Sequence, residues 1–294
     1  SILKIFSSLS SQHSYQNQLY KKPKPYIGFS GYPDTLGHNK YGYKGPDLSN
    51  STNKDFIIAF FGGSTGYNGD PAIPKLIELE LKKNNFNGSD VFISNFSVIA
   101  SNHNQHLHMI IESLMLKNID LVIFYGGYNE IIQTAAYDSR PGYPYDFFYI
   151  NEYPTWKKLI IENSFIAQKF FKPRYIPKKK DEIPFSKSWQ KSVKNNYLTT
   201  IKKAKKITSA LNSNVIDSTV FFAFYQPYQF ELTGPELHEQ IIKDISDFNY
   251  IFDVSNAYDT INSSFIDVVH VNQKSKQIMS KIIAKKIIEN IIIE

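Results

Sequence analysis

The feature that most constrains the fold is an apolar run at residues 55–61 that ends at Gly62, Gly63 and Ser64. Such a run is typical of a strand buried on both faces of a parallel sheet, and a helical pattern resumes at about Pro71. Ser64 therefore lies in a tight turn at the carboxyl end of a strand, where open α/β sheets bind their ligands. Taken alone, a short glycine–serine motif is more often an ordinary loop, so the rest of the chain must decide its role.

The alternation of strand and helix continues along the chain, which predicts right-handed crossovers and a parallel sheet. We expect a three-layer α/β/α sandwich of flavodoxin-like character, with a mainly parallel central sheet. The expected strands are residues 55–62, 90–97, 119–126, 218–225 and 249–254, and the expected helices are residues 71–85, 103–117, 189–211, 235–248 and 273–293.

Two segments do not follow this alternation. Residues 1–54 are polar and turn-rich, and we expect them to form an irregular N-terminal extension that packs on the core. Residues 131–188 are rich in Pro, Tyr and Lys and are predicted to be an insertion at the carboxyl edge of the sheet. The main domain would then span residues 55–294.

The composition excludes several classes of function. The 294 residues contain no cysteine, which excludes thiol catalysis, disulfides and cysteine metal sites. The net charge of +6 comes largely from lysine-rich runs such as residues 202–206, which we interpret as a solvated helix face. No nucleic-acid-binding motif is present, and we predict neither a cofactor nor a nucleic-acid partner.

Polar residues follow several of the predicted strands. Ser64 follows the first strand, the segment 95–104 follows the second, and Asn129 follows the third. Asp267 and His270 lie together before the last helix. A histidine three residues after an aspartate can donate Nδ1–H to the carboxylate and keep Nε2 free as a base for a serine. Each motif is common by itself, and Asn129 is equally typical of a turn, but their order and placement at strand ends favour a serine nucleophile.

In these motifs the chain resembles the SGNH/GDSL hydrolase superfamily. Gly62-Gly63-Ser64-Thr65 is similar to the first conserved block, residues 95–101 to the second, and Gly127-Tyr128-Asn129-Glu130 to the third, while Asp267 and His270 match the Asp-x-x-His of the last block. The resemblance covers residues 55–290 without the insertion. Upstream, residues 23–28 and 39–45 are similar to a leader in exported or membrane-anchored members associated with bacterial surface polysaccharides.

The resemblance implies a role for each matched residue. Ser64 would be the nucleophile, His270 its base and Asp267 the group that orients His270. The N–H groups of Ser64 and Ala100, together with the Asn129 amide, would form the oxyanion hole. The residues expected to contact the substrate are Gly63, Tyr128, Tyr143 and Tyr145.

Two positions depart from the family pattern. Ala100 stands where the second block usually has glycine, and an alanine would be strained if the position requires a positive φ. Glu130 stands where the third block usually has the shorter aspartate. Neither change removes a reacting group.

We expect a serine-dependent ester hydrolase, with an O-acetyl group on a carbohydrate as the favoured ester. An O-acetyltransferase that modifies a bacterial surface polysaccharide is the nearest alternative, and a glycan-binding module without activity is a third. The resemblance implies an exported protein of the periplasm or cell envelope. The chain begins at Ser1 rather than Met, which leaves room for a leader or a membrane anchor ahead of it.

Other candidate residues have simpler interpretations. His103 and His106 share a helix face and could bind zinc, but no carboxylate or cysteine is near them in sequence, so we expect polar contacts at a helix start. His238 is a rival base that we expect to be solvated. Aromatic residues crowd the insertion and either pack it onto the domain or bind sugar rings; they are Tyr137, Tyr143, Tyr145, Tyr149, Tyr153 and Trp156.

Overall fold

The computed structural model describes residues 22–114, 118–136, 140–145, 155–167, 186–211, 219–229, 235–261 and 264–291. Its centre is a five-stranded parallel sheet with the strand order β4-β3-β5-β6-β7. Numbered along the sheet's own strands, this order is 2-1-3-4-5, the flavodoxin-like arrangement. The predicted α/β/α sandwich is therefore confirmed. The strands are β3 (Phe56–Gly62), β4 (Val91–Asn95), β5 (Leu121–Gly126), β6 (Val220–Tyr225) and β7 (Ile251–Asp253).

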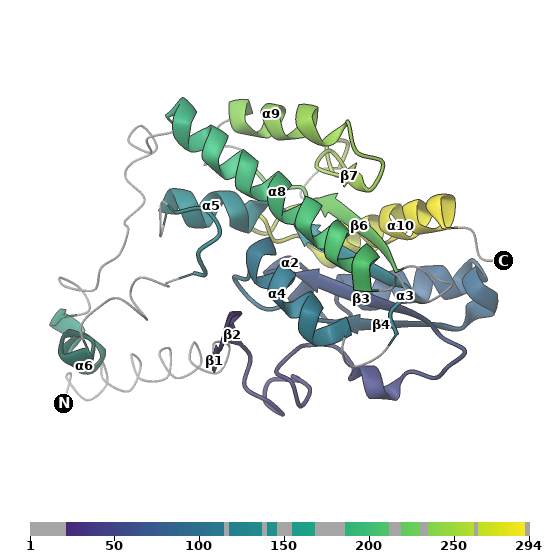
Figure 1. Ribbon diagram of the computed structural model, residues 1–294, viewed down its shortest axis with the longest axis horizontal. Helices are drawn as coiled ribbons and strands as arrows, with labels where there is room; N and C mark the ends of the chain where they lie inside the picture. The colour runs from purple at the N-terminus through teal and green to yellow at the C-terminus, as the bar shows by residue number, and fades with distance from the viewer. Residues whose placement is uncertain are drawn as a thin grey trace.

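The helices form one layer on each face of the sheet (Figure 1). The side chains of successive strand residues point to opposite faces of the sheet, and they form one apolar cluster on each face. On one face Ile57, Ala59 and Phe61 of β3 pack with helices α4 (His103–Leu114), α8 (Lys187–Leu211) and α9 (Pro235–Ile245). On the other face Ile58 and Phe60 pack with α3 (Ile73–Lys83) and α10 (Gln273–Asn290).

The remaining helices are short or lie near the edge of the sheet. Helix α2 (Ser64–Tyr67) follows β3 directly, and α5 (Tyr128–Ala136) follows β5. The first residues of the expected insertion thus continue a helix that begins at Tyr128. Helix α6 (Thr155–Asn163) lies within the expected insertion, and two single-turn helices are η1 (Leu48–Asn50) and η2 (Phe86–Ser89). Much of the rest of the insertion, including Tyr137, Tyr149 and Tyr153, falls outside the described residues.

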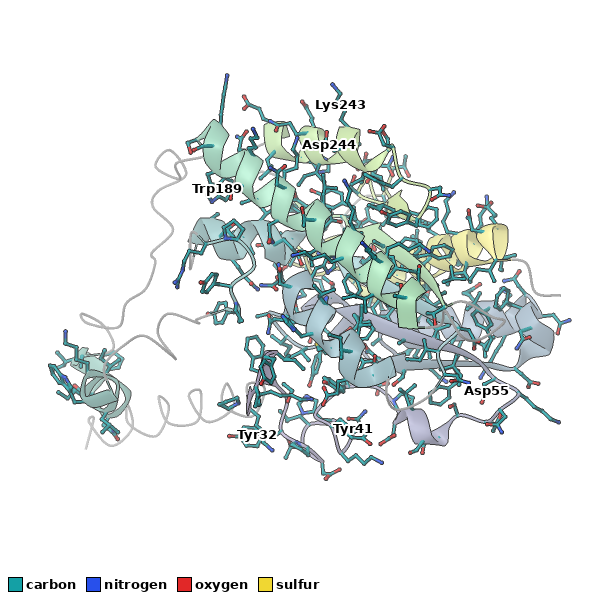
Figure 2. The ribbon with its side chains drawn as sticks, in the orientation of Figure 1. Tyr32, Tyr41, Asp55, Trp189, Lys243 and Asp244 are labelled. Atoms are coloured by element: carbon teal, nitrogen blue, oxygen red, sulfur yellow. The ribbon has the colours of Figure 1, made fainter. Side chains whose placement is uncertain are left out.

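The N-terminal extension is more ordered than its sequence predicts. Strands β1 (Lys22–Lys24) and β2 (Gly28–Ser30) form an antiparallel hairpin. Ile27, Phe29 and Tyr43 from this segment are buried in the same apolar cluster as α4 and α8. Of the two tyrosines labelled in Figure 2, Tyr41 packs against this cluster, whereas Tyr32 is exposed. The hairpin is thereby fixed against the body of the domain.

Two helices near the site, α3 and α10, begin with residues that favour a helix start. Pro74 stands at the second position of α3, where its missing N–H costs no helical hydrogen bond. Asn272 caps α10 by accepting a hydrogen bond from the N–H of Ser275, which is a preferred arrangement at a helix start. Within the part of the chain that the structure describes, none of the helices is both long and apolar enough to cross a membrane.

Candidate active site

Ser64 lies at the carboxyl edge of the sheet, between β3 and α2. β3 ends at Gly62, and Gly63 continues in an extended conformation. Ser64 is the first residue of α2, and the Ser64 carbonyl accepts a hydrogen bond from the N–H of Asn68 at 2.8 Å. The neighbouring Thr65 donates its hydroxyl to Gln226 Oε1 at 3.0 Å. This second contact ties the turn to the end of β6.

The loop between β7 and α10 brings His270 to Ser64. His270 Nε2 lies 2.8 Å from Ser64 Oγ, and His270 Nδ1 lies 2.7 Å from Asp267 Oδ2. Asp267 Oδ1 accepts the backbone N–H groups of Val269 at 2.9 Å and His270 at 2.8 Å. The structure thus brings together Ser64, His270 and Asp267, although 206 positions separate the first two in the chain.

The charge on Asp267 decides the tautomer of His270. Partial burial raises the pKa of Asp267, but the hydrogen bonds from the His270 and Val269 N–H groups and from the His270 ring outweigh it, so the pKa lies below its ordinary value. An ionised carboxylate only accepts hydrogen bonds. His270 Nδ1 therefore carries the hydrogen of the neutral ring, and Nε2 accepts the hydroxyl of Ser64.

Asn129, the second residue of α5, contacts the loop that carries Ser101. Its Nδ2 donates to the Ser101 carbonyl at 2.7 Å, which uses one of its two hydrogens. A Cβ atom at Gly63 would overlap this same nitrogen. The Asn129 amide therefore lies directly against the Gly63 backbone, and only glycine leaves room for it.

Ala100 adopts the left-handed conformation that its sequence position put in question. Its φ is +61°, a region in which non-glycine residues are uncommon. Its carbonyl accepts a hydrogen bond from Gln133 Nε2 at 2.6 Å, and the neighbouring Ser101 carbonyl accepts Asn129. Two hydrogen bonds from α5 thus hold the strained residue in place, with its N–H available on the loop that borders Asn129.

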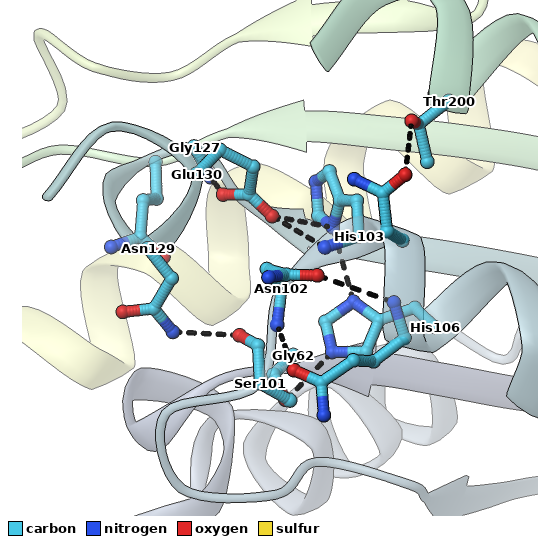
Figure 3. Close-up of polar contacts among 12 residues, drawn as sticks. Gly62, Ser101, Asn102, His103, His106, Gly127, Asn129, Glu130 and Thr200 are labelled. Carbon is cyan, nitrogen blue, oxygen red and sulfur yellow. Dashed lines mark hydrogen bonds and ion pairs between the residues drawn. The ribbon is translucent and has the colours of Figure 1, made fainter. Parts of the chain in front are cut away.

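Glu130 joins the two loops that carry Ala100 and Asn129. One carboxylate oxygen accepts the N–H of Gly127 at 2.9 Å and the other accepts the N–H of His103 at 2.5 Å (Figure 3). Burial raises the pKa of this carboxyl, while Coulombic attraction to His106 and hydrogen bonds from backbone N–H groups act in the opposite direction. The extra methylene of glutamate relative to aspartate lengthens the reach from α5 to the start of α4.

His103 and His106 form a buried polar chain behind these loops. The Ser101 hydroxyl lies 2.7 Å from the Val98 carbonyl and 2.8 Å from His106 Nε2. Because the hydroxyl has one hydrogen and donates it to a carbonyl, His106 Nε2–H donates to Ser101 and His106 Nδ1 accepts from His103 Nδ1–H, at 3.0 Å. His103 Nε2 is then unprotonated, and it is buried without a hydrogen-bond partner among the described residues.

These histidines were predicted to make polar contacts at a helix start, and they do so in the protein interior. Burial lowers the pKa of each ring to about 3, and the proximity of His103 adds to the effect at His106. Among the described residues there is no group of three or more His, Asp or Glu side chains that could hold a metal ion. Sequence reasoning missed this chain because its contacts to Ser101 and Glu130 are visible only in three dimensions.

The residues predicted to contact the substrate lie in different surroundings. Gly63 and Tyr128 lie beside Ser64 and Asn129 in the chain. Tyr143 is 37% exposed, and its carbonyl accepts Asn102 Nδ2 at 3.0 Å, whereas Tyr145 is partly buried against the core. The expectation that His238 is solvated was wrong: its side chain is buried and its Nδ1 contacts the Tyr225 hydroxyl at 3.2 Å.

A cavity of about 260 Å³ is bordered by His270 and by Thr65, the residue after Ser64. Asp267 and His270 form part of its wall, and apolar side chains such as Ile73 and Val271 form another part. Lys276 also borders the cavity, where burial lowers its pKa and its ammonium donates to the Asn68 carbonyl at 3.1 Å. Unfilled space therefore lies next to His270, the residue that Ser64 contacts.

No protein-family model matches the chain, and no curated protein matches its sequence. Several solved structures are similar in fold. An acetylxylan esterase from Geobacillus stearothermophilus is 11% identical, with 81% of this chain and 95% of that chain covered and a TM-score of 0.49. A lipase/acylhydrolase from Enterococcus faecalis is 12% identical, with 79% and 94% covered and a TM-score of 0.48.

A third similar structure is a lipolytic protein described as of the G-D-S-L family, from Desulfitobacterium hafniense, with 10% identity, 79% and 99% of the two chains covered and a TM-score of 0.44. At these identities the likeness to solved structures concerns the fold alone. The resemblance of the site rests on Ser64, Asn129 and His270, which come from three separate blocks and meet at one edge of the sheet.

Proposed function

We propose that this protein is a serine-dependent ester hydrolase that works through an acyl-enzyme on Ser64. The observation that carries this proposal is the pair of hydrogen bonds that link Ser64 Oγ to His270 Nε2 at 2.8 Å and His270 Nδ1 to Asp267 Oδ2 at 2.7 Å. A nucleophile, its base and the group that orients the base are the arrangement that activates a serine hydroxyl at neutral pH.

In the first step Ser64 Oγ bonds to the carbonyl carbon of the ester, and its proton passes to His270 Nε2. Asp267 stabilises the imidazolium that forms, because its carboxylate is ionised and accepts the Nδ1–H. The π electrons of the carbonyl move to the carbonyl oxygen, which becomes an oxyanion. The N–H groups of Ser64 and Ala100 and the second hydrogen of Asn129 Nδ2 are the donors that we assign to this oxyanion.

Collapse of the tetrahedral intermediate breaks the bond to the leaving alcohol, which takes the proton from His270 Nε2. Water then attacks the acyl-enzyme carbonyl, gives a proton to His270, and the acid leaves as the proton returns to Ser64 Oγ. His270 acts as base and acid in turn. Its side chain is 31% exposed, so water can reach the acyl group directly.

The ester that we propose is an O-acetyl group on a carbohydrate. The access that water has to His270 is also open to a sugar hydroxyl, which favours O-acetyl transfer to a polysaccharide as the second candidate function. The two reactions share the acyl-enzyme and differ only in the acceptor. Acetyl release measured with and without an unacetylated polysaccharide separates them, because a transferase forms the acetylated polysaccharide at the expense of acetate.

The nucleophile is tested with Ser64→Ala and p-nitrophenyl acetate. We expect kcat/KM to fall by at least about 10³-fold, since removal of a nucleophile leaves only binding and oxyanion stabilisation. A fluorophosphonate probe should label the wild-type protein and not the variant. Ser209→Ala, an exposed serine on α8 whose hydroxyl bonds only within its own helix, is the matched control. Unchanged hydrolysis by Ser64→Ala would refute the assignment.

A further inference from the structure

A groove of about 780 Å³ lies between the β1–β2 hairpin, the first turns of α4 and the segment 140–145. It is separate from the cavity beside His270 and shares none of that cavity's lining residues. Figure 1 shows the hairpin next to α4, and Asn104, Gln105 and His108 of α4 line the groove. The side chains on which its chemistry depends are Lys24, Tyr26, Asn104, Gln105, Tyr143 and Pro144.

The walls of the groove are fixed to α4 by specific contacts. Gln105 Nε2 donates to the Ile27 carbonyl at 2.8 Å, and Asn102 Nδ2 donates to the Tyr143 carbonyl at 3.0 Å. Gly28 has a φ of +92°, and a Cβ there would lie 2.9 Å from Pro144 Cγ. The hairpin and the segment 140–145 are therefore in close contact, and the groove is a built feature of the fold.

The groove borders the start of α4, a few residues after the loop that carries Ala100 and Ser101. The Ser101 carbonyl accepts the Asn129 amide, and Asn102, the next residue, donates to the Tyr143 carbonyl. Two consecutive residues thus connect Asn129 with a wall of the groove.

Among the residues that the structure describes, no packing contact explains the position of Tyr26. It stands at the tip of the hairpin, it is 90% exposed, and its φ is +61°. A left-handed conformation is unfavourable for a non-glycine residue, and an exposed ring gains nothing from burial. Residues kept in such conformations cluster at functional sites. Across the groove, the Arg140 guanidinium lies 3.9 Å from the centroid of the Tyr143 ring and braces it.

The chemistry of the groove suits a neutral polymer with apolar faces and polar rims. Tyrosine rings and prolines offer flat apolar surfaces, while Asn104 and Gln105 offer amide groups. No Asp or Glu is among the residues that line it. Its Lys24 is paired with Glu112 at 2.6 Å, its other basic lining residue is His108, and Arg140 lies over the Tyr143 ring. Sugar rings have apolar faces and hydroxyl rims that match this lining.

We propose that this groove binds the saccharide chain that carries the ester, at sugar units remote from the one that reacts at Ser64. The proposal rests on the proposed function only for the link between the bound chain and the reaction. Binding energy from remote units lowers the barrier for a polymeric substrate and leaves a small ester unaffected. Loss of an aromatic platform should weaken saccharide binding about 3- to 10-fold.

The test uses Tyr26→Ala and Tyr143→Ala in the full chain, each also combined with Ser64→Ala. Binding of xylohexaose, cellohexaose, chitohexaose and maltohexaose to the Ser64→Ala protein is measured by calorimetry. We expect at least one of these saccharides to bind, each tyrosine variant to weaken that binding 3- to 10-fold, and Tyr26→Trp to retain it. Tyr32→Ala, which removes a tyrosine of similar exposure to Tyr143 outside the groove, should bind as the parent does.

Hydrolysis of p-nitrophenyl acetate by the variants with Ser64 intact separates this proposal from the proposed function. Unchanged hydrolysis by Tyr26→Ala together with weakened saccharide binding supports the groove. Failure of all four saccharides to bind, or binding that neither tyrosine variant alters, overturns it, as does capture of a proline-rich peptide in their place. If no variant or wild-type protein hydrolyses the ester but saccharide binding still depends on Tyr26, the groove stands and the proposed function fails.

Discussion

Ala100 shows how a single residue can keep a function while it costs stability. Its methyl group occupies a left-handed position at φ +61°, but the group that we assign to the oxyanion is its backbone N–H, which any residue except proline supplies. We predict that Ala100→Gly retains kcat within about twofold, because the N–H stays and the strain is relieved. Ala100→Val should lower kcat by up to about 10²-fold, because a β-branched residue disfavours this conformation and shifts the donor.

Steady-state kinetics on p-nitrophenyl acetate, with circular dichroism to confirm folding, checks this pair of variants. The sequence raised the question by placing alanine where the family pattern has glycine, but it could not supply the φ angle. That angle depends on Gln133 and Asn129, which hold the loop from α5. Equal kcat values for the glycine and valine variants would argue against a role for the Ala100 N–H.

Glu130 acts through the backbone rather than on a substrate. Its two oxygens accept the N–H groups of Gly127 and His103, so it positions the loops that carry Asn129 and Ala100. In Glu130→Gln one oxygen becomes an NH₂ group that faces an N–H donor. We predict a fall in kcat on the order of 10-fold to 10²-fold with KM little changed, since the oxyanion donors would be misplaced.

Rescue distinguishes positioning by Glu130 from simple loss of stability. Glu130→Asp keeps both acceptor oxygens but is shorter by one methylene, so it should recover part of the kcat lost in Glu130→Gln. Glu289→Gln, which removes an exposed carboxylate that pairs with Lys285 and Lys286 on α10, should leave kcat unchanged, because surface ion pairs contribute little. Equal losses of kcat and of thermal stability in both Glu130 variants would contradict the positioning role.

At the scale of elements, the junction of β3 and α2 determines how closely Asn129 approaches Ser64. A Cβ at Gly63 would overlap Asn129 Nδ2, so Gly63→Ala should displace the amide and reduce kcat by about 10²-fold, the usual effect of losing one oxyanion donor. Gly88→Ala is the informative comparison. A Cβ at Gly88 meets nothing within 4 Å, but its φ is +62°, so this variant should lose stability and keep kcat.

Urea unfolding and p-nitrophenyl acetate kinetics on both glycine variants separate a local effect on the site from a global one. We expect a loss of kcat without a loss of stability for Gly63→Ala, and a loss of stability without a loss of kcat for Gly88→Ala. A Gly63→Ala protein with wild-type kcat would mean that Asn129 does not need its present contact with the turn. The comparison requires no knowledge of the natural substrate.

Elements with strong periodicity could be predicted from the sequence, and elements fixed by distant contacts could not. The strand ending at Gly62 and the helix α10 follow from apolar runs and helical spacing. The β1–β2 hairpin does not, because Pro23 and Pro25 interrupt any alternating pattern and Ile27 is held by Gln105 of α4. Asp267 and His270 were recognisable because they are three residues apart. That they lie near Ser64 could be expected because the carboxyl ends of parallel strands lie at one edge of the sheet.

At the scale of the whole molecule, the interior contains titratable groups that make the fold sensitive to acid. His103 and His106 are buried, and burial lowers the pKa of each to about 3 from an ordinary value of 6.5. Between these values the unfolded chain binds a proton at each ring and the folded chain does not. The free energy of unfolding therefore falls as the pH falls from 6.5 toward 3, by on the order of 1 kcal/mol per pH unit for each histidine.

Glu130 opposes part of this effect. Its raised pKa means that just above its ordinary value of 4.5 the folded state keeps a proton that the unfolded chain has lost, so it favours folding as the pH falls. It can offset at most one of the two histidines. We therefore predict that urea unfolding at pH 7, 6 and 5 gives a free energy that decreases with acid, and that His106→Gln flattens the dependence because one titrating ring is gone. His108→Gln removes an exposed ring on the same helix and should leave the slope as in wild type. Equal slopes in all three proteins would show that the buried pair does not control the acid stability of the fold.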